Sequence, residues 1–346
     1  IWVGLRAGIE RVCKYGLLVL FILAIAIVIR VATLGTPDPG RPEWNVNNGF
    51  GFLWNPRWAE LKEAKVWLAA AGQIFFTLSV GFGVILTYAS YLRRRDDVAL
   101  SGLTASTANE FAEVILGGSI VIPAAFAIFG PQVTQEIAEG GAFNLGFVTM
   151  PLVLQKVAFG QFFAFAWFFL LFIAGVTSSI SLALPAVVFL QDEFNLDRKT
   201  ASILFAIVTF NLCQVVIFFN GQGALDEMDF WGGTFCVVLF AMIEVVLFAW
   251  VFGMDKAWSE LHSGSDIRIP RIYRFIIKYI TPLFLVLILG FWFVQEGWPT
   301  LLLEKTPAEN VPYVIGTRVL LIDLFAALAF LVWLAWRKRH NGEAAR

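Results

Sequence analysis

The sequence predicts an all-α integral membrane protein. Hydrophobic residues make up 59% of the 346-residue chain, which includes 35 phenylalanines, and the mean hydropathy is +0.76. A soluble globular domain carries less apolar sequence than this. The apolar residues also form runs of spanning length, without the ten-residue alternation of a transmembrane barrel. Helices are therefore the expected spanning elements, because a helix satisfies its own backbone hydrogen bonds within hydrocarbon.

Eight apolar segments are long enough to cross a bilayer, and we expect them to form one transmembrane domain over residues 1–346. They cover about 16–34, 68–91, 99–129, 160–190, 197–220, 229–253, 273–297 and 312–336. Clusters of Lys and Arg, such as 93–95 and 337–339, fall on one side when the segments alternate in direction. By the positive-inside rule this side is the cytoplasm, and both ends of the chain lie there.

The segments 35–67 and 130–159 are then extracellular loops. The second contains an amphipathic stretch, Val133–Glu139. Either this loop folds into short helices that cap an entrance, or it is an ordinary connection.

The second spanning segment is interrupted in its middle, between residues 73 and 91, by Ser79-Val80-Gly81-Phe82-Gly83. At about 1.5 Å per residue, the interruption lies roughly 15–20 Å from the basic cluster at 93–95, near the middle of a bilayer. A helix that unwinds there exposes backbone polar groups, which must line a cavity or coordinate something. The alternative is that these small residues only let a neighbouring helix approach closely.

Three clusters of polar residues lie at a similar depth. They are Thr77 and Ser79 with the aromatic Phe76 and Phe82; Asn109 and Glu113; and Ala174, Thr177 and Ser178. Within each of the last two clusters the spacing places the residues on one helix face. Hydroxyl, carbonyl, amide and carboxylate oxygens are hard ligands, and a single carboxylate suits a monovalent cation such as sodium. The alternatives are hydroxyls bonded to their own helix in 177–179 and a hydrogen bond between helices at Glu113.

Other kinds of site are not supported by the sequence. The three cysteines, Cys13, Cys213 and Cys236, form no C-x-x-C pair, and the two histidines have no companion ligands, so no metal cluster or disulfide framework is readable. There is no G-x-S-x-G or H-E-x-x-H motif, which disfavours an intramembrane enzyme. No nucleic-acid partner is expected.

A set of motifs runs in order along nearly the whole chain: QIFFTLSVGFG, LSGLTASTANEFAEVILGGS, GAFNLGF, AGVTSSIS, LDEMDFW, DKAW and PRIY. Together they resemble the neurotransmitter:sodium symporter family, nearest to the bacterial leucine-type amino-acid transporters. The resemblance implies helices 5–12 of an inverted-repeat (5+5+2) sodium symporter fold, with the discontinuous helix at 73–91. By the same resemblance, we expect the first four helices of that fold to be missing from this chain.

The resemblance also implies a role for individual residues. Substrate contacts fall to Phe76, Thr77, Ser79, Phe82, Ser178 and Leu182. One sodium site takes Thr77 and Asn109, and the other takes the Ala174 carbonyl with Thr177 and Ser178. Glu113 stands where chloride-dependent relatives use the anion. Asp229 matches an outer gate, and Tyr91 and Asp192 match part of an inner gate. Both sodium sites are incomplete without the missing helices.

The function implied is sodium-coupled, chloride-independent symport of a neutral, apolar amino acid by alternating access. Its setting is the lipid bilayer of the plasma (bacterial inner) membrane, with a homodimer as a possible assembly. The chain is expected to be a fragment of the full transporter. The alternative is a non-transporting membrane scaffold or partner subunit, which is the expected fate of a half-symporter that folds but holds no ions.

Overall fold

The computed structural model describes residues 5–93, 95–139 and 141–344. Arg94, part of the basic cluster at 93–95, lies outside the described residues. Within them every regular element is helical. The α-helices are α1 (Arg11–Ala32), α2 (Val46–Trp54), α3 (Ala64–Thr77), α4 (Val84–Ala89), α5 (Val98–Glu110), α6 (Gly118–Phe129), α7 (Pro131–Glu139), α8 (Gly141–Phe143), α9 (Met150–Gln155), α10 (Gly160–Phe194), α11 (Arg198–Phe219), α12 (Ala224–Met228), α13 (Cys236–Val246), α14 (Met254–Leu261), α15 (Ile272–Phe275), α16 (Thr281–Trp292), α17 (Trp298–Leu301) and α18 (Val311–Ala344).

Wider π-helical turns join several of these helices into longer continuous stretches. They are Leu5–Glu10, Phe111–Gly117, Asn144–Thr149, Asp229–Phe235, Leu247–Val251, Ile276–Ile280 and Phe293–Gly297, and short 3-10 turns cover Trp58–Lys62 and Asn220–Gln222. Seven stretches in the described part of the chain are long and apolar enough to cross a membrane: Gly8–Ala32, Val98–Phe129, Gly160–Phe194, Arg198–Gln222, Ala224–Val251, Ile272–Leu301 and Val311–His340. They correspond to seven of the eight predicted segments. The one predicted segment without such a match is 68–91. It is divided between α3 and α4, and neither helix alone reaches spanning length.

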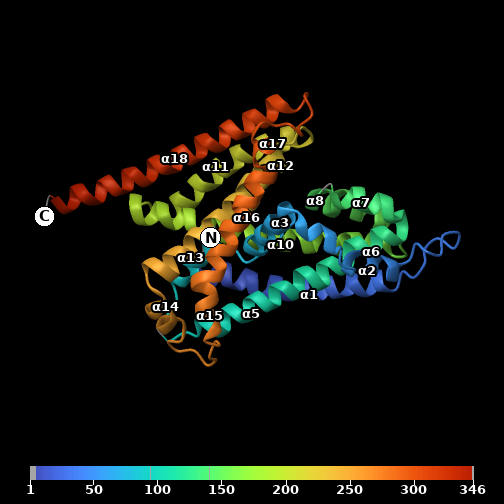
Figure 1. Ribbon diagram of the computed structural model, residues 1–346, viewed down its shortest axis with the longest axis horizontal. Helices are drawn as coiled ribbons and strands as arrows, with labels where there is room; N and C mark the ends of the chain where they lie inside the picture. The colour runs from blue at the N-terminus through green and yellow to red at the C-terminus, as the bar shows by residue number, and fades with distance from the viewer. Residues whose placement is uncertain (1–4, 94, 140, 345–346) are drawn as a thin grey trace. The chain divides into compact units, whose positions relative to one another are not determined.

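The chain divides into two compact units, the first built mainly from residues 3–58 and 102–181. Its core joins α1, α2, α6, α9 and the first half of α10 around the fully buried Ile27, Ile120 and Met150. Helix α2 lies directly on α6 (Figure 1), because Gly49 leaves room for it: a Cβ there would stand 2.7 Å from Pro123 Cα. The segment 130–159 forms the short helices α7, α8 and α9, as one of the two interpretations predicted. A capping role for them stays a prediction.

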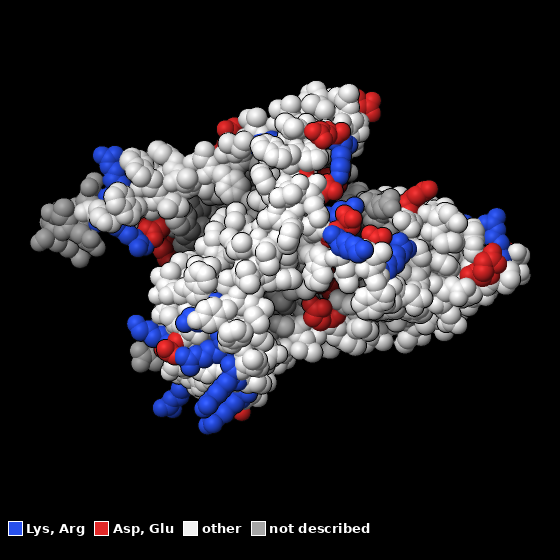
Figure 2. Space-filling view, viewed as in Figure 1, with Lys and Arg blue, Asp and Glu red and all other residues white. Residues whose placement is uncertain are grey.

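The second unit contains residues 59–101 and most of 182–346. Its core is formed by α3, α13 and α16 around Leu68, Val238 and Leu285. Helix α3 approaches the turn that precedes α13 closely, because a Cβ on Gly72 would lie 2.9 Å from Thr234 Cγ2. In this unit, Lys and Arg side chains gather at the end occupied by α14 and α15 (Figure 2).

Two of the long helices begin with an aspartate cap. Asp97 accepts hydrogen bonds from the backbone N–H of Leu100 (2.8 Å) and, from another loop of the second unit, of Asp266 (2.6 Å). Asp197 accepts from Thr200 N–H (3.1 Å) and from the Thr200 hydroxyl (2.6 Å) at the start of α11. These donors favour the charged carboxylate, so the pKa of each aspartate is lowered from its ordinary value.

Arg318 is one of the residues that join helix α18 to the rest of the second unit. Arg318 Nε donates to the Glu227 carboxylate on α12, and its two Nη atoms donate to the carbonyls of Thr300 and Leu301, each at 2.8 Å. The Trp231 indole N–H donates to the same Glu227 carboxylate at 2.6 Å. Both charged side chains are largely buried, so this is a hydrogen-bonded internal ion pair and not a surface pair.

The single-domain organisation of all eight predicted spans stays a prediction.

Candidate functional site

The helix break predicted from the sequence is present, and α3 ends in a defined cap. Ser79 adopts a left-handed conformation (φ 57°), its N–H donates to Phe76 O (3.0 Å), and Val80 N–H donates to Phe75 O (2.9 Å). This pair of bonds is the Schellman motif, which normally places glycine where Ser79 stands. A serine in this conformation carries backbone strain of about 1–2 kcal/mol. The chain keeps a hydroxyl here in spite of that strain.

The two glycines of the break are required by the backbone. Gly81 (φ 79°) and Gly83 (φ 72°) both lie in the left-handed region that favours glycine. Gly81 is also pressed against α13, because a Cβ there would stand 2.9 Å from Val237 O and 3.4 Å from Ala241 N. Helix α4 then begins at Val84 and is six residues long, so the amides of the break itself, more than a helix dipole, are available to a bound anion.

The two aromatic residues that flank the break face each other. Phe76 and Phe82 pack edge to face, with ring centroids 5.6 Å apart, and Phe76 remains 44% exposed. A Cβ on Gly233 would meet the Phe76 ring at 3.6 Å and Asp229 Oδ1 at 2.9 Å. Phe76 of the predicted aromatic wall and the predicted outer-gate carboxylate of Asp229 therefore both lie close to Gly233, in the second unit.

A carboxylate that the sequence motifs did not single out contacts the break directly. Glu244, on α13, accepts a hydrogen bond from Gly81 N–H at 3.2 Å through Oε2. The signal was available in the sequence: Glu244 is an ionisable residue within an apolar spanning segment, and such residues usually have a partner and a role.

In the first unit, the predicted pair Asn109 and Glu113 is brought together. Asn109 Nδ2 donates to Glu113 Oε2 at 3.5 Å, and both side chains are half-buried. Asn109 lies at the end of α5, while Glu113 belongs to the wider turn Phe111–Gly117 that follows. An amide and a carboxylate side by side supply oxygen atoms of the kind that bind a hard cation.

The hydroxyl cluster on α10 bonds to its own helix. Thr177 Oγ1 donates toward Ile173 O (3.0 Å) and Ala174 O (3.1 Å), and Ser179 Oγ donates to Gly175 O (2.6 Å). Oxygens that ligate a hard cation at about 2.3–2.6 Å lie roughly this far from one another, so the Ala174 carbonyl and the Thr177 hydroxyl are spaced as neighbouring ligands. Thr177 is buried and Ser178 is exposed.

The remaining predicted residues lie in the second unit. Thr77, the last residue of α3, is half-buried, and Leu182, Tyr91 and Asp192 are exposed. Leu182 is 42% exposed on α10, and Tyr91 (47% exposed) follows the end of α4. Asp192 is exposed near the end of α10, where its neighbour Glu193 forms an ion pair with Arg339 of α18. Gating roles for Asp229, Tyr91 and Asp192 stay predictions.

Comparison with known proteins agrees with this architecture. A profile described as the Sodium:neurotransmitter symporter family matches residues 2–334. The chain belongs to this family. Its helical fold also matches a crystal structure of MhsT in complex with L-phenylalanine, with a TM-score of 0.72 and 26% identity over 84% of this chain and 64% of that chain. The fold class and the family inferred from the motifs are both confirmed.

Curated relatives of this symporter-family chain are transporters and not enzymes. An uncharacterized sodium-dependent transporter of Methanocaldococcus jannaschii is 28% identical over 82% of this chain, and one of Haemophilus influenzae is 30% identical over 82%. The sodium-dependent nutrient amino acid transporter 1 of Drosophila grimshawi is 28% identical over 70%. The matched regions cover 56%, 60% and 38% of these relatives, so the chain spans little more than half the length of the first two.

Proposed function

We propose that this chain takes part in sodium-coupled symport of a neutral, apolar amino acid by alternating access. The observation that carries the proposal is the break in the middle of an apolar helix, where Ser79 and two glycines hold the backbone in left-handed conformations. Unwound backbone within a membrane is tolerated where it lines a substrate or ion path. Membership of the symporter family and the names of the relatives support the same activity.

The substrate class is argued from the second unit. Phe76 and Phe82 form an edge-to-face aromatic pair beside the break, and Leu182 adds apolar surface. Backbone amides of the break would receive the substrate carboxylate, while these side chains would contact an apolar substrate side chain. The L-phenylalanine in the MhsT complex belongs to the same class of amino acid. A difference of one methylene is worth only about 1–3 kcal/mol, so several apolar amino acids should compete.

Sodium coupling is argued from oxygens that lie within hydrogen-bond distance on α10. A cation held by the Ala174 carbonyl and the Thr177 hydroxyl would require only that the hydroxyl proton turn away from the carbonyl. Ser178, on the next position, would add a second hydroxyl. Thr77 would bind the other ion.

Chloride independence is argued from Glu113. Its carboxylate lies beside Asn109 and supplies fixed negative charge where a mobile anion would otherwise balance the bound cation. Uptake should therefore be unchanged when chloride is replaced by gluconate. Glu113→Ser should make uptake depend on chloride, and a Glu113→Ser protein that is equally active without chloride would contradict this role.

The complete transport cycle is proposed for a full-length protein. That protein would contain this chain together with the part of its relatives that the chain does not match. The matched region covers 56% of one relative and 60% of another. We therefore propose that the chain is the C-terminal part of a full transporter, with its ends on the cytoplasmic side.

Uptake measurements test the proposal. The complete product of the reading frame would be reconstituted in liposomes and supplied with radiolabelled L-leucine or L-phenylalanine, with a sodium or a potassium gradient. Uptake that requires sodium, and that leucine, methionine and alanine inhibit more strongly than glutamate or lysine, is the expected result. Equal uptake in potassium would refute sodium coupling. A folded protein that binds neither sodium nor any amino acid would support the scaffold role instead.

A further inference from the structure

Glu244 is an isolated charge in an apolar environment. From Cys236 to Val251 it is the one ionisable residue in the sequence apart from the cysteine itself, and it lies eleven positions before Asp255, or roughly 17 Å along a helix. A charged side chain at that depth in a membrane costs about 2.5–3.5 kcal/mol on insertion scales. The side chain is half-buried, so it needs a partner within the protein.

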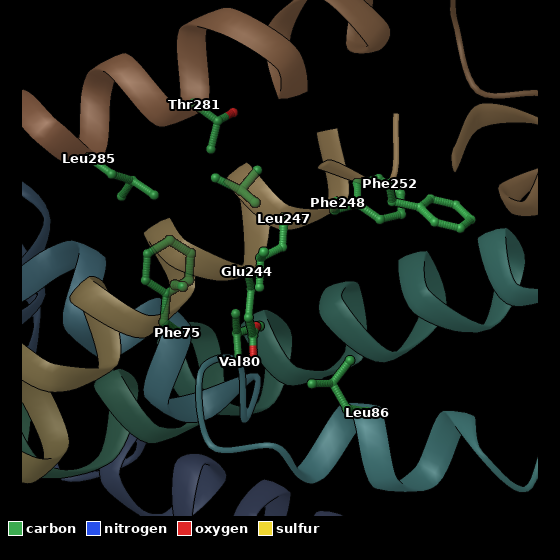
Figure 3. Close-up of a pocket in the computed structure, with 11 residues that line it drawn as sticks. Phe75, Val80, Leu86, Glu244, Leu247, Phe248, Phe252, Thr281 and Leu285 are labelled. Carbon is green, nitrogen blue, oxygen red and sulfur yellow. The ribbon is translucent and has the colours of Figure 1, made fainter. Parts of the chain in front are cut away.

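The surroundings of Glu244 offer it a backbone donor. Glu244 lines a cavity of about 530 Å³. Among the described residues that line this cavity, Glu244 and Thr281 are polar and the others are apolar. Figure 3 shows the carboxylate turned toward Val80 and the break, away from Leu247. Gly81 N–H therefore supplies this carboxylate with a hydrogen-bond donor.

The hydrogen bond to Gly81 is part of a larger contact surface on α13. Val237, Ala241 and Glu244 lie at i, i+4 and i+7 and so share one face of the helix. Val237 and Ala241 meet Gly81 through backbone atoms, at 2.9 Å and 3.4 Å from the position of a Cβ. Glu244 then adds the hydrogen bond. Close packing against Val237 and Ala241 therefore holds the break at Gly81, and the Glu244 carboxylate, about one turn further along α13, accepts a hydrogen bond from it.

We propose that Glu244 is a positioning residue, which fixes the unwound segment 79–83 in its substrate-binding geometry by accepting the Gly81 N–H. This inference rests on the proposed function, because it concerns the affinity of the same break for its substrate. With Gly81 held, Ser79 and Phe82 on either side of it keep the positions from which they contact substrate. Without it, the segment samples other conformations, and the substrate must select one of them.

The test separates the hydrogen bond from the charge and from the cavity. Glu244→Gln keeps an acceptor oxygen and loses the charge, whereas Glu244→Asp keeps the charge and withdraws it from Gly81 by one methylene. Glu244→Leu loses both at similar volume. Leu247→Ala is the matched control, because Leu247 lines the same cavity three positions further along the chain and its apolar side chain offers no acceptor to Gly81 N–H.

Hydrogen exchange of a peptide covering 75–85, in lipid nanodiscs, reports on the hydrogen bond without any substrate. Exchange should become about 10- to 100-fold faster in Glu244→Leu and Glu244→Asp, and should stay near wild type in Glu244→Gln and Leu247→Ala. Unchanged exchange in both Glu244→Leu and Glu244→Asp would overturn the proposal. Having both variants keeps the test decisive if one of them does not fold.

Uptake kinetics report on positioning. The substrate KM should rise at least tenfold in Glu244→Leu, with a smaller change in maximal rate, and Glu244→Gln should restore a KM near wild type. Equal effects of Glu244→Leu and Leu247→Ala would assign the role to the cavity and overturn the proposal. If the wild-type protein shows no sodium-dependent uptake, the proposed function fails, while the exchange measurement still tests the contact between Glu244 and Gly81.

Discussion

The broken helix α3–α4 and the continuous helix α10 both place hydroxyl-bearing residues in apolar sequence, but they treat the backbone differently. In α10, the hydroxyls of Thr177 and Ser179 donate to carbonyls of the preceding turn, so the polar groups are satisfied locally and the helix runs for 35 residues. In the break, three residues have positive φ, and Gly81 N–H is satisfied by a side chain from another helix.

The difference shows which region depends on its neighbours. A back-bonded hydroxyl can turn to a ligand and return to its own helix, so these polar groups of α10 need no hydrogen-bond partner from another helix. The geometry of the break is determined by α13, through Gly81 and Glu244, and is lost when that contact is lost. Substitutions in the break should therefore alter folding and binding together, whereas substitution of the Thr177 hydroxyl on α10 should alter binding alone.

The largest effect is expected for Gly81→Ala. The new Cβ would occupy a position 2.9 Å from Val237 O, at a φ of 79° that L-residues rarely adopt. Strain at such positions costs about 1–3 kcal/mol before any clash is counted, and we expect uptake to fall at least 100-fold with a lower thermal midpoint. Gly290→Ala is the control, since a Cβ on this α16 glycine meets nothing within 4 Å. Equal loss in both variants would contradict the dependence of the break on α13.

A smaller and more selective effect is expected for Thr177→Val. The hydroxyl bonds to carbonyls of its own helix, so the thermal midpoint should stay within a few degrees of wild type. The sodium concentration for half-maximal uptake should rise about tenfold, which corresponds to roughly 1.4 kcal/mol of lost cation binding. Ser179→Ala removes a hydroxyl with the same kind of bond and should leave the sodium dependence unchanged. A Thr177→Val protein with normal sodium affinity would contradict the proposal that α10 contributes to the sodium site.

An effect of opposite sign on folding is expected for Ser79→Gly. Glycine relieves the strain at φ 57° but has more freedom in the unfolded chain, which leaves a net stabilisation of about 0.5–1 kcal/mol. If the hydroxyl contacts substrate, the KM should rise a few-fold at the same time. Thermal unfolding and uptake on the same preparation would check both. A stabilised variant with unchanged KM would show that Ser79 serves the fold alone.

The smallest effect concerns the caps of the continuous helices. Backbone donors lower the pKa of Asp97 and Asp197, so the stabilisation from these caps is complete above the unfolded-state value of about 3.9 and is lost as the pH falls through the lower folded-state pKa. Asp97→Asn should lower the thermal midpoint at pH 7 and lower it less at pH 3. Asp197→Asn should behave alike, and a constant difference between each variant and wild type across this range would contradict the assignment.

The sequence was sufficient to predict the spanning helices, the position of the break and the local clusters. Each of these depends on residues close together in the chain, such as Ser79 and Gly81, or Asn109 and Glu113. The contact between Gly81 and Glu244 joins residues 163 positions apart, and neither helical periodicity nor composition reveals such a pair. Only the depth of Glu244 in its segment indicated that it needed a partner. For Thr177 the sequence left two alternatives, a hydroxyl bonded to its own helix or a hydroxyl that binds a cation, and helical periodicity supports both equally.

The ion pair between Arg318 and Glu227 has a consequence for how the protein is made. An arginine within a spanning segment disfavours its insertion, by about 2.5–3.5 kcal/mol at the centre of the membrane and less toward the ends. Arg318 lies seven positions into α18, and its partners come from α12 and α17, which are synthesised earlier. The last helix therefore emerges from the ribosome when the groups that receive its charge are already in the bilayer. This order of synthesis makes α18 a late addition to helices already assembled. Chains interrupted before α18 should expose a Glu227 carboxylate that keeps the Trp231 N–H but lacks the Arg318 charge, which quality control can recognise.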